Sequence, residues 1–178
     1  MPSFLIFFAA FTSLSMPVVP QFGQSQCLTD RFFTSGFISP AAINQLSDLE
    51  IKSIGTSSSK VNTIRLLTNA VIDGSINLSA LPELSVSEII SILTSVKGIG
   101  NWTAKMFLIF SMNELDVLPF EDAAFLQSYQ WMYNTSNTDA TAVKLKCKKW
   151  SPHSSIAARY LYRALDTGLT KEPFHLYK

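Results

Sequence analysis

Apolar residues recur at helical spacing in several parts of the chain. Between residues 57 and 72, four of them fall on one helical face, namely Val61, Ile64, Leu67 and Val71. The segment from 102 to 111 is apolar nearly all round, which predicts a helix buried on every side. No segment alternates between apolar and polar residues as a half-buried strand does. The pattern therefore predicts an all-α protein, an orthogonal bundle of short helices.

Capping residues mark where the predicted helices begin. Ser39-Pro40 opens a short helix to about Gln45, and Ser151-Pro152 opens the last long helix to about Thr167. Serine precedes glutamate by three residues at Ser47 and again at Ser85, which is capping-box spacing. Helices are also expected from about Asp122 to Met132 and from Asn137 or Thr138 to about Lys149, with a loop through Asn77 and Pro82.

The first residues admit two interpretations. Residues 4–11 are almost entirely apolar and resemble the core of a secretory signal, but no Lys or Arg occurs before Arg31. The run is too short to cross a membrane. We favour a buried first helix over residues 3–13, followed by a second helix to about Thr34, and secretion is the alternative.

Composition limits the remaining possibilities. With 178 residues the chain can form one domain, or two small lobes, around a substantial core. The formal net charge of +1 is not the strong basic excess typical of nucleic-acid-binding domains, although a local basic patch would not need one. Cys27 and Cys147 fit no metal-binding spacing, and two idle thiols are favoured over one disulfide.

A glycine-rich turn connects two of the predicted helices. Gly98 and Gly100 flank Ile99, which can point into the core, and Asn101 is a candidate N-cap for the following helix. Backbone N–H groups at such a turn point outward and suit a phosphate oxygen. These residues alone fit a plain corner between helices equally well.

Asp122 is the candidate for chemistry. It follows a proline-containing loop and stands where a helix should begin, so the helix dipole favours its charged form, whereas the neighbouring Glu121 opposes it. An acidic residue at a helix start is also ordinary capping chemistry. Taken alone, Asp122 reads as a cap.

The order of several short motifs changes this weighting. Gly98-Ile99-Gly100-x-Trp102-Thr103-Ala104 is followed by Asp116-Val117, Pro119 and then Asp122, and later by the segment Trp150-Ser-Pro-His-Ser-Ser-x-Ala157. Together they resemble the helix-hairpin-helix (HhH-GPD) DNA glycosylase superfamily over about residues 46–168. The closest similarity is to AlkA-type DNA-3-methyladenine glycosylases of base excision repair.

The resemblance implies a role for each matching residue. Asp122 falls on the catalytic aspartate, which stabilises positive charge on the sugar as the damaged base leaves. Trp102, Met106 and Tyr162 fall around the flipped base. The DNA-binding positions are the hairpin residues Gly98, Ile99, Gly100 and Thr103, and in the first loop Ser13 and Leu14, of which Leu14 is the better apolar wedge.

The resemblance also implies which nucleophile and which cofactors the enzyme would need. Trp102 stands where strand-cleaving relatives have a lysine, and the four-cysteine iron–sulfur cluster of some relatives is missing, so we expect a monofunctional enzyme that uses water and requires no cofactor. A structural monovalent cation would be held by the carbonyls of Thr94, Val96 and Ile99. Ser154 replaces a family arginine, and Thr12 and Ser13 replace glutamines of the DNA-inserting loop.

The sequence is compatible with three functions. The first is a glycosylase that acts on damaged double-stranded DNA as a monomer, in the bacterial cytoplasm or the nucleus, with no membrane association. The second is an inactive DNA-binding module, motivated by Ser154 and the altered first loop. The third is a helical protein-interaction domain. The chain would be a minimal or shortened member without a separate N-terminal β lobe, its two lobes flanking a DNA-binding cleft.

Overall fold

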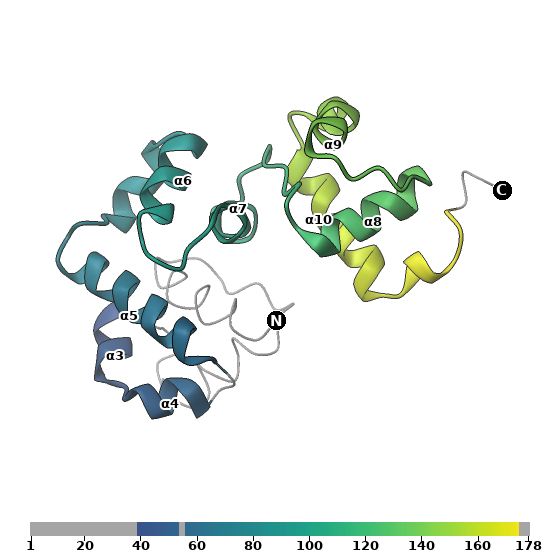
Figure 1. Ribbon diagram of the computed structural model, residues 1–178. Coiled ribbons are helices and arrows are strands. Elements are labelled where there is room, and N and C mark those ends of the chain that lie inside the picture. The colour runs from purple at the N-terminus through teal and green to yellow at the C-terminus, as the bar shows by residue number, and fades with distance from the viewer. Residues whose placement is uncertain (1–38, 54–55, 175–178) are drawn as a thin grey trace. The chain divides into compact units, whose positions relative to one another are not determined.

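The computed structural model describes residues 39–53 and 56–174, and these residues form helices and connecting segments without strands (Figure 1). The α-helices are α3 (Pro40–Gln45), α4 (Asp48–Ser53), α5 (Ser58–Ile72), α6 (Val86–Thr94), α7 (Asn101–Phe110), α8 (Ala123–Tyr133), α9 (Ala140–Cys147) and α10 (Ser154–Asp166). Short 3-10 helices are η1 (Leu78–Glu83), η2 (Lys148–Trp150) and η3 (Leu169–Lys171). The predicted all-α class is confirmed.

Several predictions fall outside the described residues. They are the two helices within residues 1–38, the wedge residues Ser13 and Leu14, and the thiol of Cys27. The described chain divides into two compact units between Phe107 and Leu108. Two lobes flanking a DNA-binding cleft stay a prediction.

In the first unit, local capping starts the helices as the sequence predicts. The Ser39 hydroxyl accepts a hydrogen bond from the Ala42 N–H at 3.1 Å, directly before Pro40 in the first turn of α3. Both capping boxes form. Ser47 donates its N–H to the Glu50 carboxylate at 2.7 Å, and Ser85 donates its N–H to Glu88 at 2.8 Å. These contacts satisfy N–H groups that a helix start leaves without intrahelical partners.

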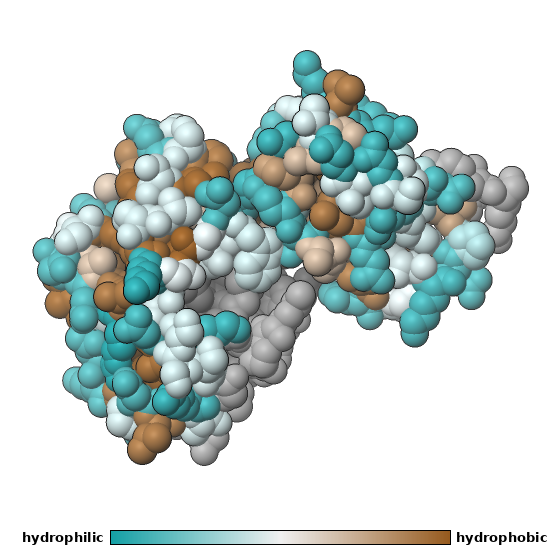
Figure 2. All heavy atoms as spheres, viewed as in Figure 1, coloured by the Kyte–Doolittle hydropathy of each residue, from teal (hydrophilic) through white to brown (hydrophobic). Residues whose placement is uncertain are grey.

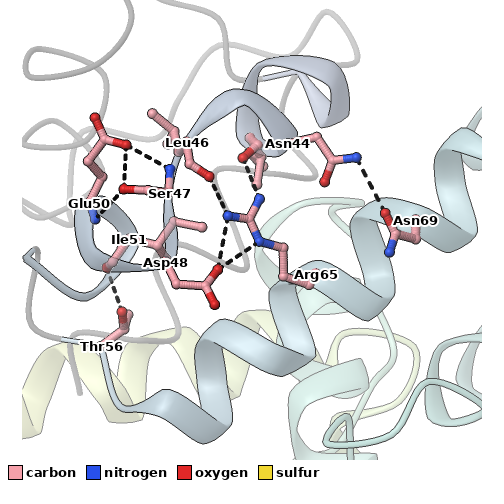
Figure 3. A network of polar contacts seen from close by, with 10 residues as sticks. Asn44, Leu46, Ser47, Asp48, Glu50, Ile51, Thr56, Arg65 and Asn69 are labelled. Atoms are coloured by element: carbon pink, nitrogen blue, oxygen red, sulfur yellow. Dashed lines mark hydrogen bonds and ion pairs between the residues drawn. The ribbon is translucent and has the colours of Figure 1, made fainter.

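Arg65 on α5 joins this helix to α3 and α4 (Figure 3). Its guanidinium donates to the Ile43 carbonyl at 2.8 Å and to the Leu46 carbonyl, where α3 ends. It also pairs with Asp48 at the start of α4 at 3.0 Å. One side chain thus satisfies carbonyls at one helix end and pairs with the acid at the next helix start.

The core of the first unit comes from the faces that the periodicity indicated. On α5, Val61, Ile64 and Leu67 are buried, whereas Val71 is only half-buried. On α6, Ile89 and Leu93 are fully buried. Four helix boundaries or caps differ from prediction: η1 replaces the loop at 77–82, α7 already includes Asn101, Asp139 caps α9, and α10 begins at Ser154.

Three of these differences have a local cause. The Asn77 side chain accepts from the Ser79 N–H at 3.1 Å and starts η1. Asp139 accepts from both Thr141 and Ala142 N–H groups and so caps α9 in place of Asn137. The His153 N–H donates to the Trp150 carbonyl at 2.7 Å, which closes a turn around Pro152 before α10 begins at Ser154.

The second unit is built on α8 packed against α10 (Figure 1). Its core residues come from α8, α9 and α10, and they are Phe125, Tyr129, Val143, Cys147, Ala158 and Leu161. Cys147 is a free thiol, and burial raises its pKa to about 11. A thiol that is buried and protonated behaves as a small apolar core residue. In the described ranges, no helix is both long and apolar enough to cross a bilayer.

Candidate functional site

The glycine-rich turn between α6 and α7 is a tight hairpin. The Val96 N–H donates to the Leu93 carbonyl at 3.2 Å, and the Ile99 N–H donates to the Val96 carbonyl at 3.0 Å. Ile99 is 5% exposed, while both flanking glycines are exposed. The side chain of Ile99 therefore holds the turn in the core, and the backbone at Gly98 and Gly100 faces outward.

Gly98 is required by its backbone angle and by its neighbour. Its φ of +97° lies in the left-handed region, and a Cβ atom placed there would lie 2.0 Å from the Thr63 hydroxyl oxygen. Thr63 belongs to α5, so that helix approaches the hairpin backbone more closely than any side chain at position 98 would allow. The sequence contains no signal for this contact, because Thr63 lies off the predicted apolar face of α5.

Asp122 is the N-cap of α8. Its carboxylate oxygen Oδ1 accepts a hydrogen bond from the Phe125 N–H at 2.7 Å, and its own N–H donates to the Pro119 carbonyl at 3.0 Å. The residue is 5% exposed, which is unusual for a carboxylate at a helix start. The prediction that Asp122 caps a helix is thus confirmed. Unlike an ordinary cap at the protein surface, its carboxylate is buried.

Tyr162 on α10 donates its phenolic hydrogen to the Asp122 carboxylate. The pKa of Tyr162 lies far above its ordinary value, first because burial disfavours the phenolate, and then because the charges of Asp122 and Glu121 and the hydrogen bond to Asp122 favour the neutral phenol. Tyr162 therefore remains a hydrogen-bond donor throughout the physiological range. The structure brings together two of the predicted site residues, which are 40 positions apart.

Phe110 packs next to Tyr162, and Arg159 packs next to Phe110. Its ring centroid lies 5.9 Å from that of Phe110, and the Arg159 guanidinium lies 5.5 Å from the Phe110 ring. Arg159 also donates to the Ile109 carbonyl and, at 2.9 Å, to Asn113 Oδ1. Arg159 on α10 thus binds the end of α7, next to the Phe110 ring that packs against Tyr162.

The loop before Asp122 is bound to the start of α10. The Val117 N–H donates to the Ser155 hydroxyl at 2.9 Å, and the Ser155 N–H donates to the Leu115 carbonyl at 2.9 Å. Asp116 accepts from the Ser151 hydroxyl at 2.5 Å and from the Ser154 N–H and hydroxyl. These hydrogen bonds lower the pKa of Asp116 below its ordinary value, and the one from the Ser151 hydroxyl has the largest effect. The charge of the nearby His153 lowers it further.

The remaining candidates lie in the first unit. Trp102 and Thr103 are half-buried in the first turn of α7, and Met106 is 3% exposed. Of the three residues expected to offer carbonyls to a cation, Val96 uses its carbonyl to accept the turn hydrogen bond from Ile99 and keeps a second lone pair. The roles of all these residues, and of Thr94 and Ile99 at the cation, stay predictions.

Comparison with known proteins decides the family. DNA-3-methyladenine glycosylase 1 of Schizosaccharomyces pombe is 32% identical over 129 residues, which are 71% of this chain and 57% of that protein. The solved structure of the S. pombe enzyme Mag1 in complex with abasic DNA matches with a TM-score of 0.70 and 27% identity, covering 92% of this chain and 80% of that one. The chain belongs to the helix-hairpin-helix DNA glycosylase superfamily.

Other members of the superfamily agree with this placement. The DNA-3-methyladenine glycosidase of Bacillus halodurans matches with a TM-score of 0.70 and 25% identity, covering 96% of this chain and 78% of that one. A putative DNA-3-methyladenine glycosylase of Bacillus subtilis is 25% identical over 71% of this chain and 45% of its own length. The chain thus spans about half the length of these curated relatives, and no family model matches it.

Superfamily membership also explains the motif order found in the sequence. Asp116-Val117 and Ser154-Ser155, which belong to separate motifs, contact each other directly and hold the loop that leads to Asp122. Ser154, which replaces a family arginine, contributes two of these hydrogen bonds to Asp116. Sequence reasoning missed Thr63 and Arg159, and it placed Ser155 in a motif without predicting its contact with Val117, since no local pattern specifies contacts made across the fold.

Proposed function

We propose that this protein is a monofunctional DNA glycosylase of base excision repair, which hydrolyses the N-glycosidic bond of flipped alkylated purines such as 3-methyladenine. The observation that carries the proposal is the buried Asp122 carboxylate, which receives hydrogen bonds from the Phe125 N–H and the Tyr162 hydroxyl. The names of the S. pombe and B. subtilis relatives support the choice of substrate. In this proposal the protein binds damaged double-stranded DNA as a monomer, in the nucleoid or the nucleus.

The chemistry needs a fixed negative charge beside the sugar. As the bond between C1′ and the base nitrogen breaks, the base takes the bonding electrons and positive charge develops on the sugar ring. Asp122 stabilises this charge, because its position is set by hydrogen bonds before the reaction starts. Water then adds to C1′ and releases one proton. A base that is cationic before cleavage leaves as a neutral molecule, which favours alkylated purines.

The first unit would hold the DNA and the base. The exposed backbone at Gly98 and Gly100 offers N–H groups to a phosphate, and Trp102 offers an electron-rich ring to a cationic base. Met106, Thr103, and the wedge residues Ser13 and Leu14 complete the proposed contacts. The carbonyls of Thr94, Val96 and Ile99 would hold a monovalent cation, and hydrolysis by water requires no other cofactor.

Base release from methylated duplex DNA tests the proposal. DNA treated with a methylating agent is incubated with the protein, and free bases are separated and identified by mass. We expect release of 3-methyladenine and abasic sites without strand cleavage. Binding of the same DNA with no base released at any protein concentration would contradict the proposal and favour a non-catalytic DNA-binding module.

A Tyr162→Phe variant should release the base about 10- to 100-fold more slowly in single turnover. The substitution removes a hydrogen bond to a charged group, which is typically worth about 1.5–3 kcal/mol, and keeps the ring against Phe110. Because the phenol stays protonated, the defect should not change between pH 7 and pH 9. The matched control is Tyr160→Phe on the same helix, whose side chain is 74% exposed. Equal rates for the two variants would contradict the role of Tyr162.

A further inference from the structure

Four lysines lie within six residues of one another in the second unit, and we call them the lysine surface: Lys144, Lys146, Lys148 and Lys149. They belong to α9 and η2, and all four are exposed. Residues 140–150 contain no Asp or Glu, and within the described residues no carboxylate forms an ion pair with any of the four. Around α9, Figure 2 shows hydrophilic residues interspersed with hydrophobic ones.

Aromatic rings hold three of these ammonium groups in place. The Nζ atom of Lys144 lies 3.9 Å from the centroid of the Phe120 ring. The Nζ atoms of Lys146 and Lys149 lie 4.9 and 5.1 Å from the Tyr133 ring, which is stacked on Trp150. A cation–π contact orients a lysine without neutralising its charge. The lysine surface therefore gathers four ammonium groups that form no ion pair with a carboxylate in the part of the chain that the structure describes.

The lysine surface adjoins the loop that carries Asp122. The ring of Phe120, which contacts the Lys144 ammonium group, belongs to a residue two positions before Asp122. The preceding residue, Pro119, is fully buried. Trp150 also packs edge-on against Phe125, whose N–H binds Asp122. The aromatic residues beneath the lysines are thus part of the framework that positions the catalytic carboxylate.

We infer that the lysine surface binds phosphates of the DNA backbone, in addition to the contact proposed for the hairpin. The inference rests on the proposed function, because the Asp122 loop beside these lysines faces DNA only if the protein acts on DNA. Lysine ammonium groups neutralise phosphates without reading base sequence. The surface would therefore strengthen binding to any duplex equally and would hold the strand near Asp122.

The salt dependence of binding to an undamaged duplex tests the inference. Two double variants, Lys144→Gln with Lys148→Gln and Lys146→Gln with Lys149→Gln, are compared with the wild-type protein by fluorescence anisotropy at several salt concentrations. Each phosphate contact contributes about 0.9 to the slope of log K against log salt concentration. We expect each double variant to lower the slope by roughly 2 and the affinity at physiological salt by about 10-fold or more.

The matched control is the double variant Lys52→Gln with Lys171→Gln, which removes the same charge from exposed positions elsewhere. The slope of the control should equal that of the wild-type protein. Equal slopes for all variants, or equal losses in the control, would overturn the inference, as would a wild-type protein that binds no DNA. The binding assay requires no catalysis, so a protein that binds through these lysines but releases no base would contradict only the proposed function.

Discussion

The Asp122→Asn variant should release alkylated bases at least 10²- to 10³-fold more slowly than the wild-type protein, with DNA affinity retained. Asparagine keeps the shape of the side chain but removes the negative charge that, in the proposed mechanism, stabilises the cationic sugar. It is also as good an N-cap as aspartate, so its oxygen can still accept from the Phe125 N–H and α8 should form normally. Single-turnover release from methylated duplex DNA measures the effect.

The chain offers a matched control for this substitution. Asp139 is the N-cap of α9 and accepts from the Thr141 and Ala142 N–H groups at 2.9 and 3.1 Å, but it is exposed. Asp139→Asn removes the same charge from the same kind of helix position, and its rate of base release should stay at the wild-type level. Full activity in Asp122→Asn, with thermal unfolding unchanged in both variants, would show that Asp122 only caps a helix.

The Gly98→Ala variant should be destabilised by about 2–5 kcal/mol, combining roughly 1–2 kcal/mol for a non-glycine residue in the left-handed region with 1–3 kcal/mol for overpacking. Both costs follow from the φ of +97° and the 2.0 Å separation between the added Cβ and the Thr63 hydroxyl oxygen. Such a loss is a large part of the stability of an ordinary domain. Urea unfolding followed by circular dichroism measures it.

Gly100→Ala is the control for Gly98→Ala. Gly100 lies in the same hairpin, its φ is not in the left-handed region, and nothing in the described residues lies within 4 Å of a Cβ placed there. We expect a change below about 1 kcal/mol. A double variant, Gly98→Ala with Thr63→Ala, should recover part of the loss because it removes the clashing hydroxyl. Equal stability of Gly98→Ala and Gly100→Ala would contradict the close approach of α5.

Local sequence was enough to predict most of the described helices and the residue that caps α8. Serine followed three residues later by glutamate forms a capping box through contacts within a single turn, so Ser47 and Ser85 were identified without knowledge of the fold. The period of apolar residues likewise identified the buried face of α5. Two helix starts differ from the prediction by a few residues, because a turn encloses Pro152 before α10 and Asp139 caps α9.

The sequence by itself therefore determined the all-α class, the hairpin and Asp122 as a helix cap, because these depend on residues within a few positions of one another. Only the tertiary structure decided that Asp122 is buried and receives the Tyr162 hydroxyl, that Ser155 holds the loop at Val117, and that Thr63 leaves no room for a side chain at position 98. These contacts join residues 35 to 40 positions apart along the chain. Their geometry depends on how whole helices pack, and no local pattern of residues specifies that packing.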